Sequence, residues 1–183
     1  MKRRVAWCIT GSGDKIGEVL ERMEKISRRF SDVEICVYLS KAGEQVLRYY
    51  RLLERLRNSF GNLWVEKNSN SPFLAGDLQL GKFDFLLIAP ASSNTVAKIA
   101  HGIADSLVSN SAIMALKAFI PVYILPSDIE EGVTTTVLPD GKVMKLRIRK
   151  EDAENTRKLS EMDGITILRN VEEIERAFEE NYL

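Results

Sequence analysis

Side chains that form disulfides or bind metals are scarce in this sequence. It contains two cysteines, Cys8 and Cys36, and one histidine, His101. Both cysteines lie inside apolar runs, and neither belongs to a CxxC motif or to a cluster with the histidine. Disulfide scaffolds and structural zinc sites need several such residues at short spacings. We therefore expect both cysteines to be buried structural thiols in a reducing cytoplasm.

An excess of either charge and a long hydrophobic run are also missing. The chain has 26 basic and 26 acidic residues, so no net field draws it to nucleic acid or anionic lipid. The N-terminal apolar stretch, residues 5–9, is too short for a signal peptide and far shorter than the roughly 20 residues of a membrane span. These absences predict a soluble, cytoplasmic protein without a nucleic-acid or membrane partner.

Short apolar runs alternate with amphipathic segments along the first 128 residues. The runs are too short for helices and are typical of buried parallel strands. We predict strands over residues 5–10, 33–39, 83–90 and 120–128. The segments between them predict helices over residues 15–30, 40–56, 93–101 and 105–118, whereas residues 57–82 show no regular pattern. This alternation predicts one α/β domain over residues 1–183, with an open parallel sheet flanked by helices.

The pattern changes after residue 128. Two alternating runs flank the turn signal Pro139-Asp140-Gly141 and predict a β-hairpin insertion over residues 133–148. The remaining residues predict a helix over 150–162, a short strand over 164–168 and a final helix with Asn170 as its N-cap. The C-terminal part therefore belongs to the same domain.

Hydroxyl groups are frequent in the turns that follow three of the predicted strands. Gly11-Ser12-Gly13 follows the first strand, Ser40 follows the second, and PASSNT, residues 90–95, follows the third. Open parallel sheets bind ligands outside the carboxyl ends of their strands, and the first N–H groups of helices attract anions. A helix cap needs only one hydroxyl residue, so the surplus in PASSNT predicts a ligand. The glycine spacing differs from the dinucleotide motif, because Ile16 stands at its third glycine position.

The segments ITGSG, LSKAG and APASSNTVAKIAHGIADSL resemble the flavoproteins related to the homo-oligomeric flavin-containing cysteine decarboxylases. The resemblance covers about residues 4–128 and implies a Rossmann- or flavodoxin-like fold that binds FMN noncovalently. It implies that Thr10, Gly11, Ser12 and Ser40 hold the ribityl phosphate and that residues 92–95 line the flavin. The complete set of implied cofactor-binding residues is Thr10, Gly11, Ser12, Gly13, Ser40, Ala91, Ser92, Ser93, Asn94 and Thr95.

Two departures argue against cysteine decarboxylation. The decarboxylases carry a catalytic histidine before this motif, and the corresponding stretch FLAGDLQLGK, residues 73–82, has none. Their substrate clamp after the fourth strand is replaced by LPSDIEEG, residues 125–132. We interpret His101, on the helix after PASSNT, as a packing or capping residue.

The archaeal flavoprotein branch of the family, of the archaeoflavoprotein A type, is the better match. It shares Ser71-Pro72-Phe73, the PASSNT block and PVYILPSD. Two cysteines cannot hold the iron–sulfur clusters of a related type, since each cluster needs about four thiolates. The resemblance implies an FMN-dependent oxidoreductase that accepts electrons from a ferredoxin-type donor and reduces an unidentified acceptor. No residue stands out as a general acid or base.

Two other functions remain open at this point. A flavin prenyltransferase-like transferase is supported by Lys117, which matches an active-site lysine of those enzymes, although the arginine expected after the fourth strand is absent. A non-catalytic protein that only binds flavin would have the same sequence features.

Self-association is predicted by aromatic residues in a polar stretch and by the family. Trp64 and Phe73 lie between residues 60 and 80, and the helix over 40–56 carries an apolar stripe that is wide for an isolated monomer. The family implies a trimer-based assembly or a dimer, so we expect residues 60–80 of one chain to reach the flavin of another. The hairpin has two open interpretations, a flap over the flavin and a surface element that packs on a neighbouring subunit.

Overall fold

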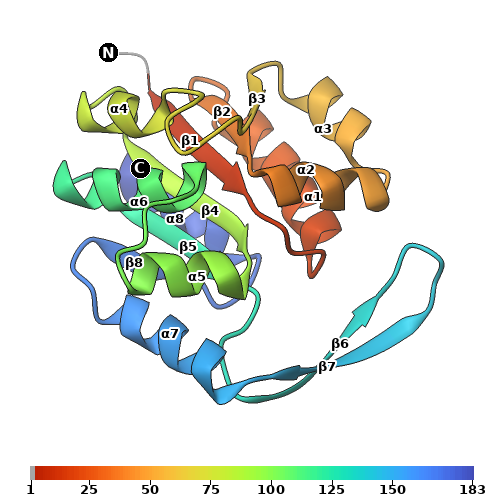
Figure 1. Ribbon diagram of the computed structural model, residues 1–183. Coiled ribbons are helices and arrows are strands. Elements are labelled where there is room, and N and C mark those ends of the chain that lie inside the picture. The colour runs from red at the N-terminus through yellow and green to blue at the C-terminus, as the bar shows by residue number, and fades with distance from the viewer. Residues whose placement is uncertain (1–2) are drawn as a thin grey trace.

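A parallel sheet forms the centre of the computed structural model, which describes residues 3–183 (Figure 1). Its six strands pair in the order β3-β2-β1-β4-β5-β8, and every pairing is parallel. The strands are β1 (Arg4–Ile9), β2 (Glu34–Leu39), β3 (Leu63–Val65), β4 (Phe85–Ala91), β5 (Val122–Pro126) and β8 (Ile165–Ile167). The predicted α/β fold with an open parallel sheet is confirmed.

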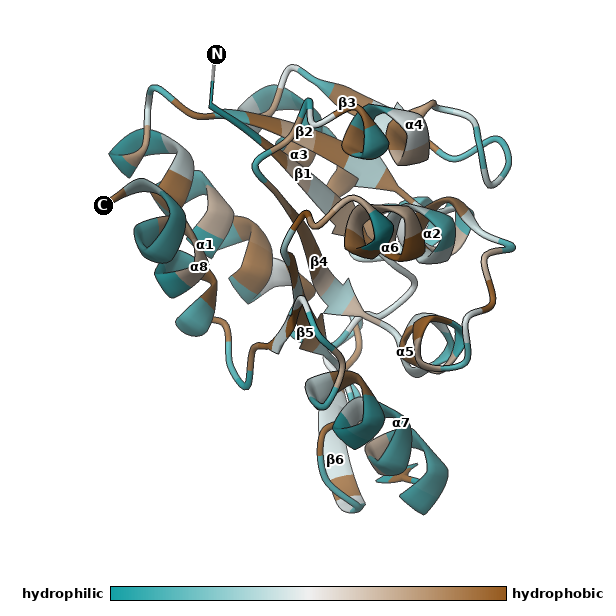
Figure 2. Ribbon diagram, turned by 90° about the vertical axis from the view of Figure 1, so that its left-hand side faces the viewer, coloured by the Kyte–Doolittle hydropathy of each residue, from teal (hydrophilic) through white to brown (hydrophobic). Residues whose placement is uncertain are grey.

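Helices cover both faces of this sheet. They are α1 (Ile16–Arg29), α2 (Lys41–Tyr49), α3 (Leu53–Ser59), α4 (Leu74–Gln79), α5 (Ser93–Ala100), α6 (Leu107–Lys117), α7 (Lys150–Ser160) and α8 (Glu173–Tyr182). The hydrophobic core on one face packs against α1, α3 and α8, and the core on the other packs against α4, α5, α6 and α7. Figure 2 shows α1 and α8 on one side of the sheet and α4, α5 and α6 on the other.

Strand β1 shows why the apolar runs are continuous. Val5, Trp7 and Ile9 point into one core, while Ala6 and Cys8 point into the other. Successive residues of a strand face opposite sides, so a strand covered on both faces must be apolar at every position. Burying each large apolar side chain contributes about 1.5–3 kcal/mol.

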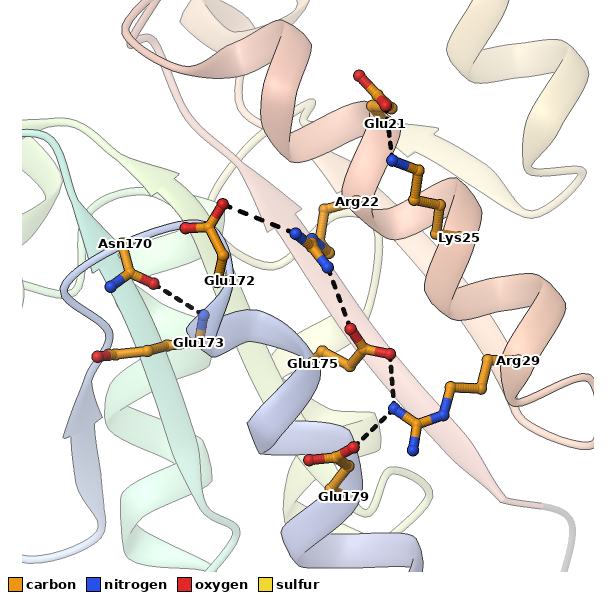
Figure 3. Close-up of polar contacts among 9 residues, drawn as sticks. All are labelled: Glu21, Arg22, Lys25, Arg29, Asn170, Glu172, Glu173, Glu175 and Glu179. Carbon is orange, nitrogen blue, oxygen red and sulfur yellow. Dashed lines mark hydrogen bonds and ion pairs between the residues drawn. The ribbon is translucent and has the colours of Figure 1, made fainter.

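Ion pairs join the polar surfaces of α1 and α8 (Figure 3). Arg29 Nη1 lies 2.6 Å from both Glu175 Oε1 and Glu179 Oε1, and Arg22 Nη1 lies 3.1 Å from Glu175 Oε2. The Arg29 guanidinium lowers the pKa of Glu175 through its hydrogen bond. Just before α8, Asn170 Oδ1 accepts the N–H of Glu173 at 3.0 Å, as expected for its predicted capping role.

The predicted helix over residues 40–56 is wrong as a single element. The structure divides it into α2 and α3, because Arg51 adopts a left-handed φ of 58° between them. The break turns Leu53 and Leu56 into the core of their own chain, and Tyr50 and Leu52 pack against that core. The apolar stripe is therefore largely covered within one monomer and does not require a partner.

The stretch without a predicted pattern, residues 57–82, contains regular structure. Strand β3 pairs with β2, and α4 packs Leu74 and Leu78 into the core shared with α6. Both elements are short, at 3 and 6 residues, so neither is long enough to show a hydrophobic period.

The predicted hairpin is confirmed. Strands β6 (Gly132–Val137) and β7 (Val143–Ile148) pair antiparallel and project from the body between β5 and α7 (Figure 1). Gly141 has a φ of 83° in the connecting turn, a conformation that favours glycine. We call residues 132–148 the arm. Within residues 3–183 the structure has no helix long and apolar enough to cross a membrane.

Candidate functional site

Strands β1 and β4 lie side by side at the centre of the sheet, and the chain leaves them in opposite directions along it. This reversal creates a crevice at the carboxyl ends of the two strands, where doubly wound sheets bind their ligands. The loops are joined directly, since the N–H of Thr10 donates to the Pro90 carbonyl at 3.2 Å. The predicted location of a ligand site therefore coincides with a real junction of two loops.

Thr10 fastens this junction. Its hydroxyl donates to the Pro90 carbonyl at 2.8 Å and accepts the N–H of Ser92 at 2.7 Å. The residue is only 1% exposed, so both hydrogen bonds are shielded from water. Thr10 therefore positions the loop after β4 and has no free hydroxyl to offer a ligand.

A cavity of about 260 Å³ opens at the carboxyl ends of β1, β4 and β5. We call it the switch-point cavity. The loops after these strands, the end of α2 and the inner side of the arm form its walls. Its lining residues are Gly11, Ser12, Gly13, Asp14, Tyr50, Ser92, Ser93, Ser127, Asp128, Thr134, Thr136, Met144 and Leu146.

Five of the predicted cofactor-binding residues line this cavity, namely Gly11, Ser12, Gly13, Ser92 and Ser93. The Ser12 and Ser127 hydroxyls lie 2.5 Å apart, which links the loops after β1 and β5. The Ser93 hydroxyl donates to the Asp128 carboxylate. The three loops are thus held together by hydroxyl contacts across the cavity floor.

The other five predicted residues lie outside the lining, and the protein itself uses most of them. Ser40 caps α2 by accepting the N–H of Gly43 at 2.9 Å. Thr95 is buried, and its hydroxyl lies 3.2 Å from that of Ser92. Ala91 is buried at the end of β4, whereas Asn94 is exposed on the first turn of α5.

An internal carboxylate occupies the helix terminus expected to bind an anion at Ser40. Glu66, just after β3, accepts the N–H of Lys41 at 3.1 Å and the N–H of Leu107 at 2.8 Å. These N–H groups begin α2 and α6, where the helix dipole favours negative charge. The first turn of α5, whose Ser93 lines the cavity, remains as a helix terminus that faces a ligand there.

Glycine is required where the loop after β1 passes α2. A Cβ on Gly11 would lie 2.6 Å from the Cβ of Ala42, and one on Gly13 would lie 2.6 Å from the Tyr50 ring. Real Cβ atoms do not approach other atoms so closely. The two glycines therefore let the loop pack against the α2 segment while it forms one wall of the cavity.

Sequence reasoning missed eight lining residues. Ser127 and Asp128 carried a visible signal, because they follow the fourth predicted strand as the other site residues follow theirs. Asp14 and Tyr50 had no such signal. The arm residues Thr134, Thr136, Met144 and Leu146 share one face of an alternating hairpin, but nothing in the sequence places that face over the sheet.

The polar groups of the cavity are hydroxyls and carboxylates, and no cationic side chain among residues 3–183 lines it. Burial raises the pKa of the Asp14 carboxyl, Lys15 lowers it, and the nearby Asp128 raises it again. Such a lining accepts hydrogen bonds from ligand hydroxyl and N–H groups. A negatively charged ligand group would instead meet the backbone N–H groups of the glycine loop and of the first turn of α5.

The remaining sequence candidates lie outside this site. His101 is the C-cap residue of α5 through its backbone N–H, and its Nε2 lies 2.9 Å from Asn155 Oδ1 on α7, so it has both a capping and a packing contact. Cys8 and Cys36 are buried and form no disulfide within residues 3–183, and burial raises the pKa of the Cys8 thiol. In the described part of the chain the structure has no cluster of histidine, cysteine and carboxylate side chains suited to a metal.

A larger groove of about 680 Å³ lies between α7 and β8. Its lining mixes carboxylates with Lys150, Arg157 and Arg169, and it follows an edge strand of the sheet. The smaller cavity has the position and the hydroxyl lining expected for a ligand of this fold, so we place the functional site there.

A doubly wound sheet with a hydroxyl-lined cavity at its switch point is the Rossmann-type arrangement in which many proteins bind nucleotide cofactors. Comparison with known proteins specifies the class further. The family model described as Flavoprotein matches residues 1–180, and the chain belongs to this family.

Relatives that match most of this chain are found among archaeal proteins. An uncharacterised protein of Methanocaldococcus jannaschii is 46% identical over 173 residues, which cover 94% of this chain and 92% of the relative. The dihydromethanopterin reductase (acceptor) of the same organism is 32% identical and covers 93% of this chain and 94% of its own length.

A solved structure is also similar over nearly the whole chain. Burkholderia xenovorans DmrB in complex with FMN, described as a cubic protein cage for redox transfer, matches with a TM-score of 0.82 and 33% identity. The match covers 98% of this chain and 94% of that protein.

Proposed function

We propose that this protein binds FMN in the switch-point cavity and acts as an FMN-dependent oxidoreductase. Electrons come from a ferredoxin-type donor and pass to a small acceptor. The observation that carries the proposal is the hydroxyl-lined cavity at the β1–β4 junction of a chain that belongs to the Flavoprotein family. The 33% identity to a protein solved with FMN supports the choice of cofactor.

The residues present fit FMN by the chemistry of their donors and acceptors. The N–H groups of Gly11 and Gly13 and of the first turn of α5 suit the phosphate, and the Ser12 and Ser127 hydroxyls suit the ribityl chain. Tyr50, Met144 and Leu146 supply the apolar lining that a flavin ring needs. When bound, FMN supplies the redox chemistry, and the chain orients it and limits its access to water.

One chain encloses only part of such a cofactor. The cavity measures about 260 Å³, below the usual range of about 300–1,000 Å³ for small-molecule sites. We propose that a second copy of the chain completes the site through residues 60–80, as a trimer-based assembly or a dimer. Phe73 is 62% exposed, and Trp64 is partly exposed where it stacks on Tyr38, so both are available for such a contact.

A reduced pterin is the acceptor class that we propose. A relative whose match covers 93% of this chain and 94% of its own length is named dihydromethanopterin reductase (acceptor). The Asp14 and Asp128 carboxylates suit a ring that presents amino and N–H donors, since ionised carboxylates only accept hydrogen bonds. They also disfavour an anionic acceptor, because no cation among the described lining residues compensates them.

The prenyltransferase alternative gains no support within one chain. Lys117 ends α6 just before β5 begins, at the amino edge of the sheet and opposite the cavity. It does not line the switch-point cavity, so it cannot act there without a partner subunit.

Titration with FMN tests the cofactor and its place. The purified protein should bind FMN, and Ser93→Leu should weaken binding at least tenfold because its side chain fills the cavity. Thr135→Leu, on the opposite side of the arm, is the matched control and should bind FMN like the wild type. Failure of the wild type to take up FMN, or an unchanged affinity for Ser93→Leu, would overturn this placement.

Electron transfer is tested separately. The FMN-loaded protein should be bleached by reduced ferredoxin and should regain its colour with a dihydropterin acceptor. Bleaching without reoxidation would support the ferredoxin-type donor and would rule out a reduced pterin as the acceptor. Incubation with reduced FMN and dimethylallyl phosphate should leave the flavin mass unchanged, whereas a modified flavin would favour the transferase alternative.

A further inference from the structure

The arm has two faces with different chemistry. Thr134, Thr136, Met144 and Leu146 line the switch-point cavity, and they form two cross-strand pairs of the hairpin. Successive residues of a strand point to opposite sides, so the residues between them face away from the cavity. This outer face contains Val133, Thr135, Val137, Val143, Lys145 and Arg147.

Positive charge is concentrated on the arm although the whole chain is neutral. Residues 132–149 contain Lys142, Lys145, Arg147 and Arg149 and a single acid, Asp140. Lys142 pairs with Asp140, and Arg149 pairs with Asp152 at the start of α7. Lys145 and Arg147 have no ion-pair partner within residues 3–183, and both are exposed. Two uncompensated cations therefore lie two residues apart on the outer face.

Exposed apolar side chains accompany these cations. Val133 is 72% exposed, Val143 is 64% and Val137 is 58%, and in the ladder Val133 lies opposite Arg147 and Val137 opposite Val143. No carboxylate belongs to this face. Thr135 and Lys145 form the middle pair of this face, between the two pairs that contain the valines, so cationic and apolar side chains are mixed along it. A surface that carries charge of one sign selects a partner of the opposite sign.

We propose that the outer face of the arm is the docking site for an acidic, single-electron carrier protein of the ferredoxin type. This inference rests on the proposed function and assigns its electron donor to a surface. The opposite face of the same ribbon lines the cavity, so a docked carrier would be separated from the cofactor by little more than one strand layer. Packed strand layers lie about 10 Å apart.

The number of electrons that each carrier delivers determines how the docking site must work. Each reduced carrier transfers one electron and dissociates in its oxidised form. Two successive encounters are therefore needed to reduce the cofactor by two electrons, and the protons come from solvent. Docking must therefore be fast and reversible. Electrostatic attraction suits this requirement, because it raises association rates more than it prolongs complexes.

The carboxylates at the base of the arm do not neutralise this surface. Glu130 and Glu131 line the groove with α7 and β8, and Glu130 lies 3.7 Å from Arg169. Asp128 lines the switch-point cavity beneath the arm, where Ser93 donates to it. The acidic groups nearest to the arm therefore line these two cavities at its base and do not belong to its outer face.

Stopped-flow reduction of the FMN-loaded protein by a reduced bacterial ferredoxin tests the proposal. The wild-type second-order rate constant should fall as salt is added, because screening weakens the attraction. Lys145→Glu/Arg147→Glu should lower the rate constant about tenfold or more at low salt and remove most of its salt dependence. The neutral variant Lys145→Gln/Arg147→Gln should lie between the two.

Arg28→Glu/Lys158→Glu is the matched control. It makes the same change in net charge near the ends of α1 and α7, toward the amino edge of the sheet and away from the arm. Its rate constant should stay within twofold of the wild type. FMN affinity and reduction by dithionite should be unchanged in the arm variants, which shows that the arm is still folded.

Three results would overturn the docking site. They are an unchanged rate in the arm double variant, an equal loss in the control, and a change in subunit assembly in the arm variants, which would assign this face to a second copy. Absence of FMN binding by the wild type would instead reject the proposed function itself, so the two failures are distinguishable.

Discussion

The β1–β4 junction and the arm are opposite walls of one cavity, and they are held in place in different ways. At the junction, hydrogen bonds of Thr10 and Trp7 fix the backbone at the end of β4 and at the start of the loop after it. The arm is held by its own ladder, by its base, and by a long contact of 3.5 Å from the Tyr50 hydroxyl to the Val137 carbonyl. A two-stranded hairpin alone is only marginally stable in water. The junction is thus the firmly fixed wall of the cavity, and the arm is the wall with few contacts to the body.

Trp7→Ala should have the largest effect on stability, because it damages the junction. Trp7 is fully buried, packs edge-on against Phe60, and donates its indole N–H to the Ala89 carbonyl at 2.8 Å. Removing such a side chain costs about 3–5 kcal/mol. The free energy of unfolding should fall by this amount in urea titrations followed by circular dichroism.

The control for Trp7 is Phe119→Ala, since Phe119 is 95% exposed. Its effect should stay within about 0.5 kcal/mol. Similar losses for both variants would show that burial at the junction does not determine the stability.

Thr10→Val tests the hydrogen bonds of the β1–β4 junction while the side-chain volume stays nearly constant. It leaves the Ser92 N–H without the hydroxyl that accepts it, at a cost of about 1–3 kcal/mol for a buried group left unpaired, while the Pro90 carbonyl keeps the backbone N–H of residue 10. We expect a loss of about 2 kcal/mol, measured by thermal and urea unfolding. Thr135→Val makes the same change on the outer face of the arm and should alter stability by less than about 0.5 kcal/mol.

Replacing residues 133–147 by a short Gly-Ser link tests the other wall. The body should unfold with nearly the wild-type free energy, because the arm adds no residue to either hydrophobic core. FMN affinity should fall about tenfold, or about 1.4 kcal/mol, since the apolar cover of Met144 and Leu146 is lost. An unchanged FMN affinity would show that the arm does not cover the cofactor.

Asp14→Asn should give the smallest effect, and one that depends on pH. The pKa of Asp14 is raised in the folded chain, so between its unfolded and folded values the folded state binds more protons and stability falls as pH rises. A neutral amide at this position does not lose stability in this way as the pH rises. The variant should therefore gain a few tenths of a kcal/mol at about pH 7 and nothing below about pH 3.5, after allowance for solvent screening.

The measurement for Asp14 is thermal unfolding across this pH range. Asp14→Glu keeps a carboxylate at the position and should retain the wild-type pH dependence. A gain in the amide variant that is equal at both ends of the range would show that the charge of Asp14 is not its cause.

Continuous apolar runs predicted the sheet, because its central strands are buried on both sides. Residues 5–9 and 85–89 are apolar without interruption, and only a covered parallel strand requires this. Short elements gave no such signal. Strand β3 is defined by pairing with β2, and the break after α2 depends on Arg51 adopting a left-handed conformation, which residue type does not favour.

The candidate site was predicted at the level of loops and only partly at the level of side chains. Strand ends meet at one edge of a parallel sheet, so residues 11–13 and 92–93 were expected to lie together. The sequence does not reveal which hydroxyls the protein uses internally. Thr10 and Ser40 both look like ligand residues until the partners of their hydroxyls, Pro90 and Gly43, are known.

The register of the arm carries a consequence for how such proteins diversify. Gly132 and Ile148 are paired across the ladder, so the chain leaves the body and returns to it at neighbouring points, roughly 5 Å apart. The residues between this pair, 133–147, can therefore change in length and sequence without moving a strand of the central sheet. If the proposed docking site is correct, exchange of the outer-face residues between relatives would change the partner protein, while the inner-face residues that line the cavity stay the same.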